Sequence, residues 1–148
     1  MTDTTSLKPT NPAFEDVIRA SFAAQGLMQT LGAQLRSVAP GRVVIELPYS
    51  AAVSQQQGLF HGAGIGAIGD VAGGYAAMSL MPADSEVVTV EYSVSFIRPA
   101  VGGLLRAEGQ VLRAGKTLTV CRIDVAVIEN GQATVVALLQ ATFMRVAT

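Results

Sequence analysis

Residues 61–80 form an apolar run that can be a helix only when the rest of the chain surrounds it. Asp70 is its one charged residue, and residues 62–80 contain six glycines. Each interior glycine costs a helix about 1 kcal/mol relative to alanine, so this helix would not persist alone in water. Glycines do allow a backbone to approach another surface closely. The run therefore predicts a buried central helix enclosed by a sheet, and its glycines make it unsuitable as a membrane span.

The pattern changes to a two-residue period after Pro82. Apolar and polar residues alternate along residues 88–96, which is typical of a strand, and Thr89 is predicted to share a face with Glu91 and Ser93. A glycine pair then leads into three further predicted strands: Leu104–Arg113, Thr117–Ile128 and Ala133–Val146. An Asn-Gly pair, a strong hairpin signal, separates the last two. Consecutive hairpins predict an antiparallel meander.

A helix and a hairpin are predicted before the apolar run. Helical spacing extends over Pro12–Leu31, with Asn11 as N-cap and a glycine at the end. Two short strands follow around a Pro-Gly turn: Ala33–Val38 and Arg42–Leu47. The order of helix, hairpin, long helix and four strands predicts an α+β fold, with one sheet packed on one buried helix. We expect residues 1–11 to be a flexible tail and residues 12–148 to be a single domain.

Composition predicts a homo-oligomer. Hydrophobic residues make up 50% of the 148 residues and charged residues 14%, against roughly 25% charged residues in a typical soluble domain. A domain of this size cannot hide so much apolar surface by folding alone, so we expect burial between the subunits of a dimer or tetramer. The net charge of −1 predicts no nucleic-acid partner and no membrane partner.

The single cysteine, Cys121, excludes an intramolecular disulfide and suits a reducing compartment. Residues 1–11 lack the basic and apolar regions of a signal peptide. We therefore expect a cytoplasmic protein. A lone thiol in a chain with one histidine is a poor metal site, and buried packing is the simpler interpretation of Cys121.

His61, the only histidine, marks a candidate catalytic turn. It lies between Gly58 and Gly62, where a polar loop meets the predicted helix. The first N–H groups of a helix are unpaired and carry partial positive charge, so this junction suits an oxygen that develops negative charge. A purely structural role for His61 is the alternative.

Asp70 is the second candidate. A buried carboxylate costs several kcal/mol unless it is paired or neutralised, and no lysine or arginine lies between Arg42 and Arg98 to pair with it locally. Asp70 is therefore a candidate acid or base. The alternative is a carboxylate that is exposed to solvent or hydrogen-bonded to a neighbouring strand.

Helix geometry separates the two candidates. Nine helical residues advance about 13 Å and rotate about 900°, which places His61 and Asp70 on opposite sides of the helix. If both take part in catalysis, the site combines His61 of one subunit with Asp70 of another.

Gly64, Gly66 and Gly69 match the G-x-G-x-x-G pattern of dinucleotide-binding proteins. That pattern needs a strand before it and a βαβ crossover after it. Here a glutamine-rich loop precedes the glycines and predicted hairpins follow them. Close packing of helix on sheet is the better explanation.

Four segments, at their observed spacing, carry a resemblance to a known family: Gln55-x-x-Gly58-x-x-His61-Gly62, Asp70, Phe96-Ile97-Arg98-Pro99-Ala100 and Gly115-Lys116-Thr117-Leu118. Together they resemble the hotdog-fold acyl-CoA thioesterases, in the phenylacetate-pathway (PaaI-like) branch of the 4-hydroxybenzoyl-CoA thioesterase superfamily. The resemblance covers about residues 33–146. It implies a curved antiparallel sheet wrapped around one long central helix, in a dimer and often a tetramer.

The resemblance also implies roles for five residues. The Gly62 N–H polarises the thioester carbonyl, beside His61 and Gln55. The partner subunit supplies Asp70, as general base or nucleophile, and also Thr89. No metal or redox cofactor is needed. The family's usual His-Gly-Gly is His-Gly-Ala here, but the alanine keeps its N–H.

The residues also allow other interpretations. Arg98 and Lys116 are candidates for contacts with CoA phosphates, or are ordinary solvated turn residues. A hotdog hydratase or dehydratase usually needs a different spacing of histidine and carboxylate, and Gln56 stands where a D-x4-H pair would have its acid. A non-catalytic acyl-CoA-binding protein would need an attached effector domain. The acyl group itself is not predicted.

Overall fold

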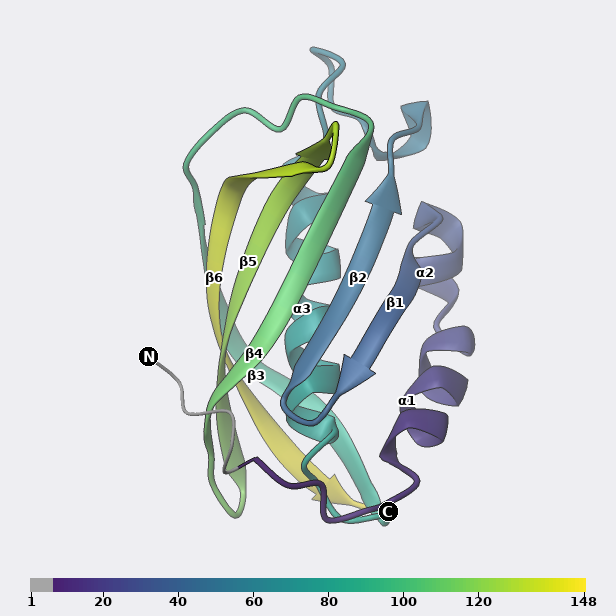
Figure 1. Cartoon of the computed structure of the whole chain (residues 1–148), viewed down its shortest axis with the longest axis vertical. Helices are drawn as coiled ribbons and strands as arrows, with labels where there is room; N and C mark the ends of the chain where they lie inside the picture. Colours follow the sequence, from purple (N-terminus) through teal and green to yellow (C-terminus); the bar gives the residue numbers. More distant parts are fainter. Residues whose placement is uncertain (1–6) are drawn as a thin grey trace.

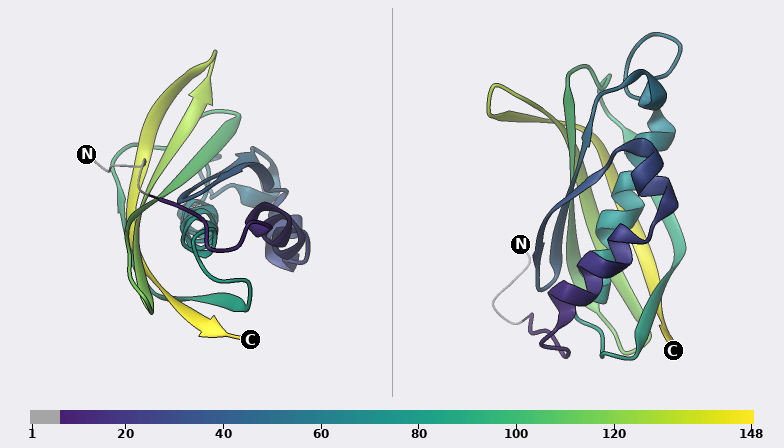
Figure 2. Two further views of the ribbon diagram at one scale, coloured as in Figure 1. Left: turned by 60° about the horizontal axis from the view of Figure 1, so that its bottom comes forward. Right: turned by 90° about the vertical axis from the view of Figure 1, so that its right-hand side faces the viewer.

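The apolar run forms the central helix of the fold. In the computed structural model, which describes residues 7–148, helix α3 (Gly62–Met78) lies in the concave face of a curved six-stranded antiparallel sheet (Figures 1 and 2). The order across the sheet is β1-β2-β4-β5-β6-β3. The predicted α+β hotdog fold is confirmed. The strands are β1 (Gln34–Ala39), β2 (Arg42–Pro48), β3 (Ser85–Phe96), β4 (Leu104–Ala114), β5 (Leu118–Glu129) and β6 (Gln132–Ala147).

Glycines in both layers let α3 lie directly on the sheet. A Cβ added to Gly73 of α3 would be 2.9 Å from Cδ1 of Ile123, and one added to Gly109 of β4 would be 2.6 Å from the backbone of Ala72. Such close packing buries apolar surface of both layers. Packing against the sheet, and not intrinsic helix propensity, therefore stabilises α3 as a helix. The G-x-G-x-x-G pattern lies inside this helix, where packing accounts for it.

The N-terminal helical region is broken where the sequence predicts one helix. It forms α1 (Phe14–Ala23) and α2 (Gly26–Leu31), which flank α3 beside β1 (Figure 2). The chain is extended at Gln25, with φ −80° and ψ 108°, and the Gln25 side chain donates to the Tyr75 hydroxyl of α3 at 2.7 Å. Gly32 ends α2 in the left-handed region, at φ +81°, as predicted. None of the helices within residues 7–148 is long and apolar enough to cross a membrane.

The start of α1 also differs from the prediction. The Asn11 side chain accepts a hydrogen bond from the Ala13 N–H at 3.0 Å. This turn places the first helical residue at Phe14, after the predicted start. Leu7 packs against the core. Residues 1–6 of the predicted tail lie outside the described residues, so the domain boundary at residue 11 stays a prediction.

A bulge in the edge strand β3 reverses the predicted face of Thr89. Thr89 pairs with Phe143 of β6 and Glu91 pairs with Thr142, so Val90 is an extra residue. Paired residues share a face of the sheet. Thr89 therefore lies on the α3 side of the sheet, with buried Phe143. Glu91 lies on the outer face, where it accepts a hydrogen bond from the Thr142 hydroxyl. The predicted shared face of Thr89 and Glu91 is wrong, because the bulge interrupts the alternation.

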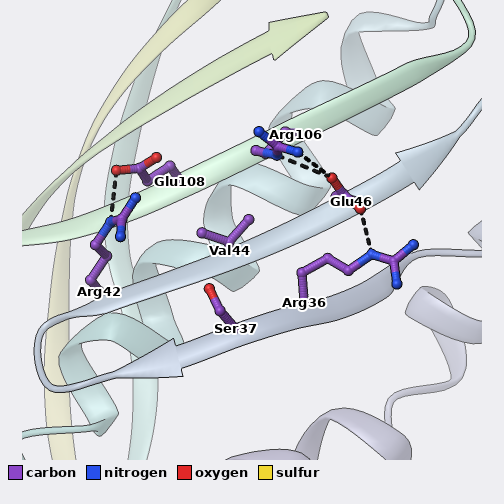
Figure 3. Close-up of a pocket in the computed structure, with 7 residues that line it drawn as sticks. All are labelled: Arg36, Ser37, Arg42, Val44, Glu46, Arg106 and Glu108. Atoms are coloured by element: carbon purple, nitrogen blue, oxygen red, sulfur yellow. Dashed lines mark hydrogen bonds and ion pairs between the residues drawn. The ribbon is translucent and has the colours of Figure 1, made fainter. Parts of the chain in front are cut away.

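The outer face of the sheet carries a cluster of ion pairs (Figure 3). Glu46 of β2 is 5% exposed and accepts hydrogen bonds from Arg36 of β1 and from Arg106 of β4, the latter at 2.9 Å. Arg42 pairs with Glu108 at 2.8 Å. Burial raises the pKa of Glu46, but the two arginines outweigh burial and hold this pKa below its ordinary value. The ionised cluster therefore ties three strands together.

Glu46→Gln is expected to destabilise the protein by about 1–3 kcal/mol at neutral pH, because an amide does not neutralise the two arginines. A carboxyl with a lowered pKa in the folded state stabilises above its unfolded pKa, near 4.3, and this contribution is lost as the pH falls through the folded pKa. The gap between variant and parent should therefore shrink in acid. Urea denaturation at neutral pH and at about pH 3 measures it.

Glu15→Gln is the matched control for this stability test. It breaks an exposed pair with Arg19, which is expected to contribute little. Equal losses of unfolding free energy in the two variants would contradict a special role for the buried cluster.

Candidate active site

The His61 turn forms the N-terminus of α3. His61 is the N-cap, and its Nδ1 accepts the Ala63 N–H at 2.9 Å. Its carbonyl accepts the N–H groups of Gly64 and Ile65 at 3.0 and 3.2 Å. Within residues 7–148, no hydrogen bond uses the Gly62 N–H, so this donor stays available for a ligand. Because its side chain and its carbonyl both accept N–H groups of the first turn, His61 fixes the start of the helix.

A mainly apolar pocket of about 220 Å³ adjoins this turn. Its wall includes Gln55, Gly62 and Phe96. Gln55 Oε1 accepts the N–H groups of Gln57 and of Leu59, the latter at 3.3 Å. The side chain of Gln55 therefore shapes the loop that leads into the helix.

The two predicted CoA contacts lie at opposite ends of the sheet. Arg98 lines the pocket beside the His61 turn, and its Nη1 donates to the Val135 carbonyl at 2.6 Å. Lys116 lies in the turn between β4 and β5, at the other end of the sheet (Figure 1). One chain does not bring these two cations together around a single ligand.

Asp70 lies in the middle of α3, in a second pocket of about 170 Å³. Its Oδ1 accepts the Thr89 hydroxyl at 2.7 Å, because the bulge turns Thr89 toward the helix. No ion pair within residues 7–148 involves Asp70. Burial raises the pKa of Asp70, and the Thr89 hydrogen bond opposes this rise. A partly buried carboxylate without a counter-ion suits a base or a nucleophile.

The His61 pocket and the Asp70 pocket share no lining residue. The first contains Gly62 and Gln55, and the second contains Asp70 and Thr89. The structure therefore brings the predicted site residues together in two groups, as the helix geometry indicated. A site that contains both groups needs a second copy of the chain.

Gln25 and Tyr75 also line the Asp70 pocket, and neither was predicted from the sequence. Gln25 comes from the break between α1 and α2, and Tyr75 from α3. The Gln25-Gly26 pair is the available signal for that break, because glycine weakens a helix interior.

Cys121 is buried beneath α3, and its thiol donates to the Gly73 carbonyl at 3.5 Å. Burial raises the pKa of Cys121 to about 12. The thiolate therefore does not form near neutral pH, and the predicted packing role is confirmed.

Comparisons of sequence and of structure find the same kind of protein. Residues 57–134 match the family described as the Thioesterase superfamily. The crystal structure of a thioesterase family protein from Silicibacter pomeroyi has a TM-score of 0.88 and 37% identity, over 91% of this chain and 99% of that chain. A Saccharolobus solfataricus protein named as an esterase is 31% identical over 112 residues, 76% of this chain and 77% of that protein. The 1,4-dihydroxy-2-naphthoyl-CoA hydrolase of Listeria monocytogenes is 26% identical over 100 residues, 68% of this chain and 81% of that hydrolase.

Proposed function

Because this chain belongs to the thioesterase superfamily, we propose that it hydrolyses acyl-CoA thioesters to a carboxylic acid and CoA. The proposal rests on Asp70, a partly buried carboxylate whose pKa is raised by burial. Asp70 accepts a hydrogen bond from the Thr89 hydroxyl. It pairs with no cation within residues 7–148. The similar hydrolase of L. monocytogenes acts, by its name, on a CoA thioester. Membership of the PaaI-like branch is part of this proposal.

The reaction uses the free N–H of Gly62 and the carboxylate of Asp70. The N–H donates to the thioester carbonyl oxygen, whose negative charge grows as the carbon becomes tetrahedral. One such donor is worth about 2.7–4 kcal/mol. In one route Asp70 takes a proton from the attacking water, the C–S bond breaks, and the CoA thiolate recovers that proton. In the other, Asp70 attacks the carbonyl carbon, CoA leaves, and water cleaves the resulting anhydride. Neither route needs a metal or a redox cofactor.

The proposed site is shared between subunits, because one chain keeps Gly62 and Asp70 in separate pockets. The edge strand β3 exposes Val90 and Phe96, each at 54%, which gives a second copy an apolar surface to cover. We propose a dimer or a tetramer of this chain in the cytoplasm. Light scattering that shows only a 15.3 kDa species at micromolar concentration would contradict the proposal of a shared site.

Release of free thiol from a panel of acyl-CoAs, followed with Ellman's reagent, tests the function directly. A thioesterase releases CoA in step with the free acid. A hydratase changes the acyl chain and leaves the thioester intact, and a binding protein does neither. Arg98 is the proposed phosphate contact, and Lys116 takes this role only if another copy of the chain brings it near the site.

Thr89→Val is expected to lower turnover by roughly tenfold, or about 1.4 kcal/mol, because Asp70 loses the hydroxyl that positions it. The hydroxyl also lowers the pKa of Asp70, so its removal should move the acid limb of the pH–rate profile to higher pH. Measurement of kcat against pH shows both effects. Thr142→Val is the control, because Thr142 faces outward and donates to Glu91. Equal profiles for both variants would assign Thr89 to sheet packing alone.

A further inference from the structure

The bulge in β3 turns two hydroxyl groups toward α3. In regular alternation, residues three apart along a strand lie on opposite faces of the sheet, but the bulge adds one residue to β3. Thr89 lies on the α3 side, and Tyr92 lies there too, because it pairs with buried Ala141 of β6. We propose that the Tyr92 hydroxyl holds the water that Asp70 activates. The inference rests on the proposed thioesterase function and adds a catalytic residue to it.

The Tyr92 hydroxyl lies against the middle of α3. Its oxygen would be 3.2 Å from a Cβ added to Gly66, so it occupies space that a larger residue there would need. Gly66 is one helical turn before Asp70, or about 6 Å along the helix axis. Helix side chains tilt toward the N-terminus of their helix, so the Asp70 carboxylate leans toward Gly66. The hydroxyl and the carboxylate therefore lie beside neighbouring turns on one face of α3.

Both groups keep an oxygen that the fold does not use. The hydroxyls of Tyr49 and Tyr75 each take part in hydrogen bonds of the fold. The Tyr92 hydroxyl takes part in none within residues 7–148, and Tyr92 is 42% exposed in a single chain. The Thr89 hydroxyl occupies Oδ1 of Asp70, and no hydrogen bond within the same residues uses Oδ2. Each group can therefore bind a water without giving up a contact.

One water fits between these two groups. Two hydrogen bonds through a water span roughly 5–6 Å, which suits oxygens beside neighbouring helical turns. The water donates one hydrogen to Asp70 and the other to the hydroxyl oxygen of Tyr92, so a lone pair remains for the carbonyl carbon. Asp70 takes the first proton as the C–O bond forms, and CoA leaves with that proton when the C–S bond breaks. The inference therefore specifies the general-base route.

The shared site encloses this water. A two-fold dimer that brings Gly62 of each copy to Asp70 of the other makes the two α3 helices antiparallel. Gly66, midway between these residues, then faces its own counterpart in the second copy. Because the Tyr92 hydroxyl lies against Gly66, the second copy covers the part of Tyr92 that one chain exposes. The water is thus shielded from bulk solvent, opposite a carbonyl held at Gly62 of the other copy.

Methanol distinguishes a held water from a general effect on the site. It has one O–H, which donates to Asp70, so its attack makes no use of Tyr92; the C–S bond breaks, CoA leaves with the proton, and a methyl ester forms. Tyr92→Phe keeps the ring and loses the hydroxyl. The probe is the acyl-CoA that the wild type cleaves fastest, in buffer that contains methanol. The variant should form free acid about tenfold more slowly, so its ratio of methyl ester to acid should rise about tenfold.

Two further variants of β3 are the controls. Ser93→Ala removes a hydroxyl from the outer face of the same strand, where Ser93 lines a different pocket. It should keep the wild-type rate and the wild-type product ratio. Thr89→Val disturbs the base that both nucleophiles use, so it should slow both reactions and leave their ratio unchanged.

The product ratio decides the inference, with the acid and the ester measured by chromatography and CoA measured with Ellman's reagent. An unchanged ratio in Tyr92→Phe would overturn it, whether or not thiol release slows, and so would free acid as the only product of both enzymes. An equal rise of the ratio in Ser93→Ala would also overturn it, because the cause would then be the strand. A wild type that releases no CoA from any acyl-CoA of the panel would instead contradict the proposed function.

Discussion

Asp70→Asn should reduce kcat for thioester hydrolysis at least about 100-fold, because the amide neither takes a proton from water nor attacks a carbonyl carbon. Asparagine keeps the shape of aspartate, and its carbonyl oxygen can still accept the Thr89 hydroxyl. The loss is therefore chemical and not steric. Thiol release at saturating substrate measures it. Asp124→Asn, which alters an exposed carboxylate paired with Arg122, is the control, and turnover of Asp70→Asn within tenfold of the parent would exclude Asp70 as base or nucleophile.

The same variant should be more stable than the parent. Burial raises the pKa of Asp70 in the folded state. Above that folded pKa, the ionised Asp70 carboxylate therefore lowers the free energy of unfolding. The cost disappears below the unfolded value of about 4, where the carboxyl is protonated in both states. Asp70→Asn should therefore unfold at a higher temperature near pH 8, and the difference should vanish toward about pH 3.5. Loss of activity together with a gain in stability separates a catalytic role from misfolding.

Local sequence signals could predict the frame of the fold. Six glycines in one apolar run are compatible with a helix only if a sheet approaches it closely, and this is how α3 packs. The Asn-Gly turn between β5 and β6 is similarly local. Asn130 and Gly131 both adopt positive φ, at 51° and 76°, as a tight hairpin requires.

Features that depend on distant contacts could not be read from local pattern. The bulge at Val90 arises from pairing with β6, some 50 residues later in the chain, so alternation alone placed Thr89 on the wrong face. Gln25 likewise bonds to Tyr75, 50 residues later in the chain, a contact that no local pattern predicts. The resemblance to a family pointed to Thr89 as a site residue, but it did not give the orientation of the Thr89 side chain. Only the fold brings its hydroxyl to 2.7 Å from Asp70.

Gly62→Pro should lower kcat by about 100- to 1000-fold, because it removes the N–H that is proposed to stabilise the developing oxyanion. Proline is well tolerated at the first position of a helix, and the residue before it, His61, already has the extended ψ of 135° that proline requires. The new ring would meet the tip of the Phe96 ring, since a Cβ at this position lies 3.1 Å from it. Gly62→Ala makes the same contact but keeps the N–H, so it should retain most of the activity. Equal losses in the two variants would indicate a steric cause.

Mixing the two inactive variants then tests whether the site is shared. In a heterodimer of Asp70→Asn with Gly62→Pro, one site combines the intact Gly62 of the first subunit with the intact Asp70 of the second. The other site carries both lesions. Random exchange makes half of the dimers heterodimers with one working site of two, so activity should return to about a quarter of wild type. If each chain held a complete site, every subunit would carry one lesion and the mixture would stay inactive. Inactive heterodimers, verified with two different affinity tags, would therefore reject the shared site even if Asp70 and Gly62 each proved essential.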